Sequence, residues 1–239
     1  MQLLDLTLPT PAENLGLDEA LLDAGEQGQL DDDILRLWDA ESIFVVLGRS
    51  GKLAREIHVD RCSADGVPLL RRSSGGGTVV AAPGCMFFSM VLSMQRNESL
   101  RMVDNAHQYV MNSVRSALLP VVPGLEIRGT CDLTLDGRKI SGNSLRIRRN
   151  WLLYHGTLLL NMNLDLLPKY LQHPPREPDY REGREHSAFV ANLSITRSVA
   201  ATALIEHMEA HIELATPPLA EARRLAAEKF SNAAWTHSR

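Results

Sequence analysis

The sequence has few cysteines, no excess of basic residues and no long apolar run, and each absence excludes a class of protein. Cys62, Cys85 and Cys131 are its three cysteines and show no Cys-x-x-Cys spacing. They argue against a disulfide scaffold or a zinc site and favour a reducing, cytoplasmic setting. The net charge of −4 offers no basic surface for nucleic acid. No run could span a bilayer, and residues 1–5 lack the basic start of a signal peptide.

The most informative motif is the glycine segment, residues 71–78, which reads Arg-Arg-Ser-Ser-Gly-Gly-Gly-Thr. Glycines let backbone N–H groups approach a ligand closely, and the two arginines supply forked donors for phosphate or carboxylate. The motif lacks the Gly-Lys-Ser/Thr of a Walker loop and the strand–helix setting of a dinucleotide fingerprint. We therefore expect an anion cradle between two strands. A flexible surface turn is the alternative.

Apolar periodicity predicts strands and single helices in mixed order. Strands are expected at residues 2–8, 34–38, 43–47, on both sides of the glycine segment, and at 86–92, 125–128 and 151–161; helices are expected at 13–28, 59–64, 103–119, 199–214 and 219–235. The polar, proline-rich residues 172–184 predict a mobile loop. This order indicates an α+β (mixed α/β) fold with a largely antiparallel or mixed sheet.

A hairpin with an Asp136-Gly137 turn places Lys139 in an unusual setting. Along an unbroken strand Lys139 shares a face with Ser141 and Asn143, and this is the more apolar face. A lysine there needs a partner for its charge. The alternative is a surface lysine near a turn.

Three further polar residues lie on or beside this hairpin and the next one. His155 interrupts an apolar strand, where it either packs in the core or shapes a pocket wall. Cys131 stands beside Asp132 and is either a nucleophile or a small buried hydrophobe.

Four segments, taken in order, resemble the lipoate–protein ligase A family of the biotin/lipoate ligase and octanoyltransferase superfamily. They are Asn14-Leu15-Gly16-Leu17-Asp18-Glu19, Leu47-Gly48-Arg49, the glycine segment, and the pair Arg138-Lys139-Ile140-Ser141-Gly142 and His155-Gly156-Thr157-Leu158-Leu159. The resemblance covers roughly residues 12–165. It implies a class II aminoacyl-tRNA synthetase/biotin synthetase-like fold, with residues 1–239 forming a single catalytic domain.

The resemblance also implies two half-reactions. Lipoate or octanoate and ATP, with Mg²⁺, give an acyl adenylate, and a lysine of a lipoyl carrier domain then accepts the acyl group. The carrier would be a 2-oxoacid dehydrogenase E2 or a glycine cleavage H-type protein. By analogy Lys139 is the catalytic residue, bridging carboxylate and α-phosphate. The implied substrate-binding residues are Arg71, Arg72, Ser73, Ser74, Gly75, Gly76, Gly77, Asn143, His155, Gly156 and Thr157, and the implied nucleotide-binding residues are Arg72, Gly77, Thr78, Asp132 and Lys139.

Three departures from the family pattern leave other functions open. Ala81 and Ala82 replace the family's His-Asp pair, which removes any nucleotide contact from that pair. Cys131 stands where ligases usually have Asn or Ser. The family's C-terminal accessory domain is not expected here, so a separate chain could replace it. The alternatives are a cysteine-dependent octanoyl or lipoyl transferase acting through a thioester on Cys131, and a non-catalytic binder of lipoate or lipoylated proteins. We expect no membrane or nucleic-acid partner, and we assign no residue as a metal ligand; Asp132 is only a candidate for magnesium.

Overall fold

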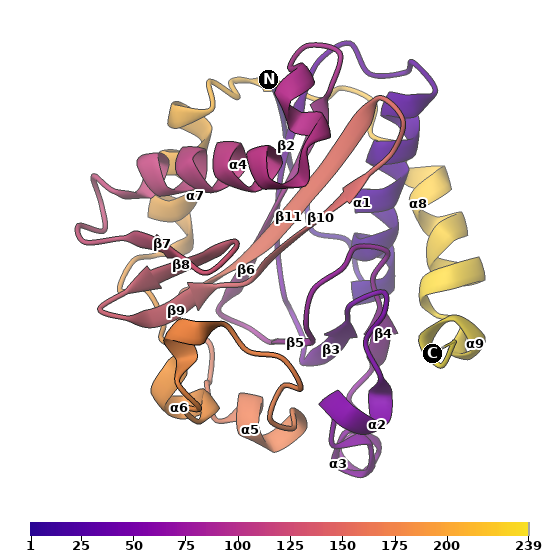
Figure 1. Ribbon diagram of the computed structural model, residues 1–239. Coiled ribbons are helices and arrows are strands. Elements are labelled where there is room, and N and C mark those ends of the chain that lie inside the picture. Colours follow the sequence, from indigo (N-terminus) through magenta and orange to yellow (C-terminus); the bar gives the residue numbers. More distant parts are fainter. Residues whose placement is uncertain (239) are drawn as a thin grey trace.

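The computed structural model describes residues 1–238 (Figure 1). The strands are β1 (Gln2–Asp5), β2 (Ile34–Asp39), β3 (Phe44–Leu47), β4 (Leu69–Arg71), β5 (Val79–Ala81), β6 (Cys85–Ser93), β7 (Glu126–Arg128), β8 (Asp132–Leu135), β9 (Arg138–Ser141), β10 (Asn143–Ile147), β11 (Trp151–Leu159) and β12 (Ile212–Glu213). The α-helices are α1 (Pro11–Glu26), α2 (Leu53–Glu56), α3 (Val59–Ala64), α4 (Val103–Leu118), α5 (Leu166–Tyr170), α6 (His186–Phe189), α7 (Arg197–His207), α8 (Leu219–Leu225) and α9 (Ala233–Thr236). Short 3₁₀ turns η1 (Glu98–Arg101) and η2 (Asp179–Arg181) and a π-helical turn η3 (Ala226–Phe230) complete them. Within this described part, no helix combines the length and the apolar character that crossing a bilayer requires.

A six-stranded sheet in the order β10-β11-β6-β2-β1-β12 forms the centre of the molecule, with β4-β3-β5 and β7-β8-β9 as smaller sheets. Strand β1 pairs in parallel with β2 and β12, whereas β6 pairs antiparallel with β2 and β11. The prediction of an α+β fold with a mixed sheet is therefore confirmed. Helices cover both faces of the large sheet: α1 and α8 on one, α4 and α7 on the other (Figure 1).

Alternation along the strands builds a hydrophobic core on each face of this sheet. In β2, Leu35 and Leu37 join the core under α4 and α7, while Ile34 and Trp38 join the core under α1. Successive side chains of a strand point to opposite faces. Arg36 therefore shares the α1 face with Ile34 and Trp38, and it is fully buried there.

The two predicted hairpins are present. Asp136 and Gly137 have φ values of 51° and 71°, as expected for the tight Asp-Gly turn that joins β8 to β9. Strands β10 and β11 form the second hairpin. Gly142 separates β9 from β10, so the chain passes from the small β7-β8-β9 sheet into the large sheet at this residue.

Two predicted helices near the C-terminus were wrong in extent. The helix expected at 199–214 ends at His207, and Ile212 and Glu213 instead extend the large sheet as β12. Glu209 has a φ of 51°, a left-handed conformation that stops the helix and turns the chain toward β1. The helix expected at 219–235 is divided into α8, η3 and α9.

Candidate active site

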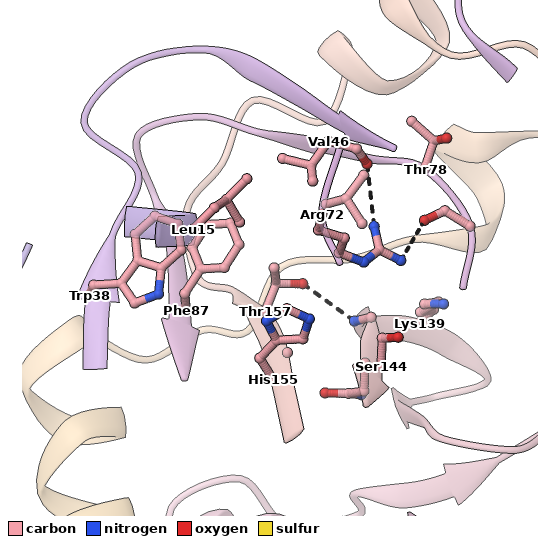
Figure 2. A pocket seen from close by; sticks show the side chains of 15 residues that line it. Leu15, Trp38, Val46, Arg72, Thr78, Phe87, Lys139, Ser144, His155 and Thr157 are labelled. Carbon is pink, nitrogen blue, oxygen red and sulfur yellow. Dashed lines mark hydrogen bonds between the residues drawn. The ribbon is translucent and has the colours of Figure 1, made fainter. Parts of the chain in front are cut away.

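A pocket of about 120 Å³ lies where residues from all three sheets meet α1. Leu15, Trp38 and Phe87 form its apolar end, and Lys139 lies at the opposite end (Figure 2). The rings of Trp38 and Phe87 are stacked, with their centroids 3.8 Å apart. An apolar wall facing a few polar groups is typical of a small-molecule site. The shape suits a ligand with a hydrocarbon tail and an anionic head.

A second cavity of about 320 Å³ adjoins this pocket and shares part of its wall. The residues common to both are Gly77, Thr78, Val79, Lys139, Gly142, Asn143 and Thr157. The remaining walls of the second cavity combine apolar residues such as Leu167, Leu171 and Phe189 with the polar residues Gln172, Arg176, Arg181 and His186. Arg176 and Arg181 come from the loop predicted at residues 172–184, which contains only η2. Two ligands could therefore meet beside Lys139.

Lys139 is held by a carboxylate at this junction. Its Nζ lies 2.6 Å from Oδ1 of Asp132, and the other carboxylate oxygen accepts a hydrogen bond of 2.7 Å from the Tyr180 hydroxyl. The lysine side chain remains 27% exposed. The sequence prediction that this lysine has a partner is confirmed, and its remaining N–H donors are accessible to a ligand.

Arg72 lies beneath the glycine segment and organises it. Its Nε donates to Ser74 Oγ at 3.0 Å, its Nη2 donates to the carbonyls of Gly75 and Gly77, and its Nη1 donates to the carbonyl of Val46. Burial lowers the pKa of Arg72 to about 10, so the guanidinium stays charged at neutral pH. Because the carbonyls of Gly75 and Gly77 point toward Arg72, the backbone N–H groups of the glycine segment point away from it.

The three glycines leave their N–H groups unbonded. Gly75, Gly76 and Gly77 are exposed, and none of their N–H groups donates to another residue within 1–238. Gly76 has a φ of 81°, which disfavours other residues. A Cβ on Gly48 would lie 2.0 Å from the Gly76 carbonyl oxygen, so this segment also needs glycine beneath it. The exposed donors match the predicted anion cradle.

Arg71 does not point into the pocket, which corrects the expectation that both arginines contact the ligand. It is fully buried, and its Nε and Nη2 both donate to the carbonyl of Thr236. Its Nη1 donates to the carbonyls of Gly48, Arg49 and Gly51. Adjacent strand residues point in opposite directions. Arg71 therefore fixes the loop after β3 and the C-terminal helices.

A row of polar residues crosses four strands on the α1 face. The residues are Ser144 on β10, His155 on β11, Ser89 on β6 and Arg36 on β2, each opposite the next. Asp18 of α1 lies over the row. One of its oxygens is 2.5 Å from Arg36 Nη1, and the other contacts Ser89 Oγ at 2.9 Å and His155 Nδ1 at 3.1 Å.

Burial opposes the charge of Asp18, but Arg36 and the hydrogen bonds from His155 and Ser89 outweigh it and lower its pKa. The other ring nitrogen of His155 lies 2.6 Å from Ser74 Oγ. Asp18 is thus connected through His155 and Ser74 to Arg72. This network links α1 to the glycine segment.

Cys131 lines the second cavity, where burial raises the pKa of its thiol to about 11. The thiolate is the nucleophilic form of cysteine. Its population at neutral pH is therefore small. No group of three or more His, Cys, Asp or Glu residues suited to a metal gathers within residues 1–238, and both oxygens of Asp132 are already engaged.

With this geometry established, the family model described as the lipoyl protein ligase A/B catalytic domain matches residues 10–213. The chain belongs to this family. The resemblance seen in the sequence is thereby confirmed.

Relatives within the ligase A/B family match over different shares of their length. A lipoate-protein ligase A of Blochmanniella floridana is 33% identical over 175 residues, which cover 72% of this chain and 48% of that protein. The chain spans about half the length of the curated relatives it matches first. A lipoate-protein ligase A solved with bound ATP is 25% identical with a TM-score of 0.78, covering 99% of this chain and 98% of that one. The bipartite lipoate protein ligase of Thermoplasma acidophilum, described with its E2 lipoyl domain, is 24% identical with a TM-score of 0.79, covering 99% and 95%. The class II synthetase-like fold is thereby confirmed.

The structure brings most of the site residues predicted for an A/B ligase to the two cavities. The pocket is lined by Arg72, Gly77, Thr78, Lys139, Asn143, His155, Gly156 and Thr157, and the second cavity adds Gly76, Cys131 and Asp132. Ser73 and Ser74 are buried and line neither. Ala81 and Ala82 are also buried, so their side chains support the small sheet.

Sequence reasoning missed the buried acid and the aromatic wall. Asp18 lies in a motif that we used for the resemblance, but no role was given to it. One signal was available: Arg36 interrupts the apolar strand Ile-Leu-Arg-Leu-Trp, and a buried arginine requires an anionic partner. No comparable signal identified Trp38 and Phe87, because apolar strand residues are ordinary core residues.

Proposed function

We propose that the protein joins lipoate or octanoate to AMP, using ATP, and then transfers the acyl group to a lysine of a lipoyl carrier domain. One observation carries the proposal: Lys139 lies in the shared wall of an apolar pocket and a larger cavity that Arg176 and Arg181 also line. A carboxylate and an α-phosphate repel one another, so a cation between them stabilises the transition state. We assign the reaction to one catalytic domain over residues 1–239.

The apolar pocket is assigned to the acyl group. The tail would lie against Leu15, Trp38 and Phe87, and the carboxylate would reach Lys139. Asp132 holds the ammonium group by its ion pair of 2.6 Å. Orientation of the two reactants side by side supplies much of the rate in such couplings.

The second cavity is assigned to the nucleotide. Its phosphates would meet Lys139 and the exposed N–H groups of Gly76 and Gly77, and Arg176 and Arg181 line the same cavity. Arg72 would reach the phosphates from the adjoining pocket. Magnesium commonly binds nucleotide phosphates with few protein ligands. We expect ATP to carry it, and no step here depends on a protein-held ion.

The partners follow from the proposed second half-reaction. The acceptor would be an E2 or H-type lipoyl carrier, and a separate accessory chain could contribute to the first half-reaction. The names of the relatives support this: one is a lipoate-protein ligase with bound ATP, and another is bipartite and was described with an E2 lipoyl domain. The raised pKa of Cys131 weighs against the thioester transferase, and the two-cavity geometry weighs against a simple binder.

Lipoate-dependent exchange of pyrophosphate into ATP tests the first half-reaction. We expect exchange by the unmodified protein and a loss of at least about 10³-fold in Lys139→Ala, because one fixed charge at the reacting centre is removed. Lys169→Ala is the matched control: it breaks an ion pair of 2.7 Å with Asp65 outside both cavities and should retain exchange. Intact mass of an apo carrier domain then reports transfer. A folded protein without exchange, or an acyl adduct on Cys131, would refute the proposal.

A further inference from the structure

The hydrogen bonds that join α1 to the glycine segment form a continuous relay. It runs from Asp18 to His155 at 3.1 Å, from His155 to Ser74 at 2.6 Å, and from Ser74 to Arg72 at 3.0 Å. Asp18, Ser74 and Arg72 are 2%, 1% and 7% exposed, so water hardly competes for these bonds. Only Arg72 and His155 of these residues line the pocket. The relay therefore connects a residue outside the pocket to a cation inside it.

We infer that Asp18 is a positioning residue: through His155 and Ser74 it fixes the guanidinium of Arg72 and the shape of the glycine segment. This inference rests on the proposed function, because it assigns the relay to the step in which Arg72 meets the phosphates. Asp18 itself does not touch the pocket.

The direction of each hydrogen bond follows from the donors available. Arginine has donors only, so Arg72 Nε donates to Ser74 Oγ. Ser74 keeps its own hydroxyl proton, and we assign that proton to the bond with the ring nitrogen Nε2 of His155. An ionised carboxylate can only accept, so Nδ1 of His155 carries a proton and donates it to Asp18. The structure thus assigns one tautomer to His155.

Arg36 explains why Asp18 is suited to this place. It is fully buried and pairs with Asp18 at 2.5 Å, so the carboxylate stays ionised despite burial. An ionised acceptor strengthens the bond from Nδ1 and fixes the ring orientation. Each further bond in the relay is polarised by the one before it. Arg72 therefore keeps its Nε turned away from the pocket, and its Nη2 fixes the carbonyls of Gly75 and Gly77.

Asp18→Asn is the main test, because it preserves shape. One amide position can still accept from Arg36, but the other presents N–H groups to Nδ1 of His155. The ring must then accept at Nδ1 and carry its proton on Nε2, which reverses the relay at Ser74. We expect kcat for pyrophosphate exchange to fall about 100-fold, a typical cost of small misplacement. The KM for lipoate should change less than about threefold.

Glu19→Gln is the matched control, since Glu19 is the neighbouring buried acid and pairs with Lys229 and Arg146 outside the relay. It should leave kcat within about twofold. Ser74→Ala cuts the same relay at another point, so its loss should match that of Asp18→Asn and the double variant should lose no more. Additive losses, or an equal loss in Glu19→Gln, would indicate a general structural effect and overturn the inference.

Nitrogen-15 NMR of the histidine ring shows which nitrogen of His155 carries the proton, and it does so without any enzymatic reaction. The signals of His155 are assigned among the eight histidines by their absence from His155→Gln. We expect the proton on Nδ1 in the unmodified protein; a proton on Nε2 there overturns the inference even if Asp18→Asn fails to fold. Absence of exchange by a protein that shows the expected tautomer counts against the ligase and not against the relay.

Discussion

Arg71 and Arg72 are adjacent in the sequence, as are Asp18 and Glu19, yet the two members of each pair point in different directions. One member of each pair lies on the pocket side of the glycine segment, and the other lies on the opposite side. On the pocket side, Arg72 meets the cavity wall and Asp18 reaches it through His155. On the opposite side, Arg71 donates to loop carbonyls and Thr236, and Glu19 pairs with Lys229 between α1 and η3. Figure 1 shows α8 alongside α1, and α9 beyond the end of α8 and close to β4.

The two sides differ in what they leave for a ligand. The opposite side is closed: Arg71 donates to four backbone carbonyls, and Glu19 pairs with the three cations Arg146, Arg148 and Lys229. The pocket side ends in exposed N–H groups of the glycine segment and in Lys139, which is partly exposed. Each side thus has one arginine and one carboxylate. On the opposite side they stabilise the fold, and on the pocket side they support the proposed reaction. The same substitution made on each side can distinguish these two roles.

Among substitutions in these two pairs, the largest effect is expected for Arg72→Lys. Lysine keeps the charge but lacks the planar fork that contacts Ser74 and two carbonyls together. We expect kcat/KM for lipoate-dependent exchange to fall about 10²–10³-fold, equivalent to about 3–4 kcal/mol in the barrier. Steady-state exchange kinetics with a parallel urea titration measure both quantities. Full activity in Arg72→Lys would show that the guanidinium fork of Arg72 is not needed for the reaction.

The matched substitution Arg71→Lys should instead lower stability and leave activity unchanged. A lysine cannot contact the four carbonyls at once, and buried acceptors left without donors are costly. We expect the free energy of unfolding to fall by about 3 kcal/mol, with exchange per folded molecule within about twofold of the unmodified protein. Urea unfolding and active-site-normalised kinetics provide the two readouts. Lost activity at unchanged stability would show that Arg71 acts on the pocket side.

Local features of the fold could be predicted from the sequence because short-range rules determine them. Asp136-Gly137 fixed the hairpin through its turn type, and strand alternation placed Lys139 on the same side as Ser141 and Asn143, with which it lines a cavity. The expected apolar face was wrong, because the neighbouring Ile140 joins the core while Lys139 pairs with Asp132. The anion cradle at the three glycines stays a prediction. Each of these inferences needed no knowledge of what packs nearby.

The division of work within each pair could not be predicted, because it depends on distant segments. Strand alternation predicts that Arg71 and Arg72 point in opposite directions. Which of the two is buried against the C-terminal helices depends on Thr236, whose carbonyl accepts a hydrogen bond from Arg71. Helix α1 is buried around most of its surface, so periodicity did not separate Asp18 from Glu19. The edge strand β12 was missed for a similar reason: its pairing with β1 joins opposite ends of the chain.

The smallest expected effect is on the loss of stability at low pH, and it concerns Glu19 on the opposite side. Burial raises the pKa of Glu19, but the hydrogen bond from Lys229 and the charge of Arg146 outweigh it, and the folded pKa lies below the ordinary value of 4.5. A lowered folded pKa gives stability that is present above the unfolded pKa and is lost as the pH falls through the folded pKa. Asp18 contributes in the same direction.

Glu19→Gln should therefore flatten the decline in unfolding free energy below about pH 4.5. The unfolding free energy should therefore fall less between about pH 5 and pH 3 in the variant than in the unmodified protein. The slope does not vanish, because Asp18 still titrates in the variant. Urea unfolding at several pH values measures this difference. If the acid slope of Glu19→Gln equals that of the unmodified protein, the ion pairs with Lys229 and Arg146 do not hold the carboxylate charged, and the closed side is stabilised by packing and by Arg71 alone.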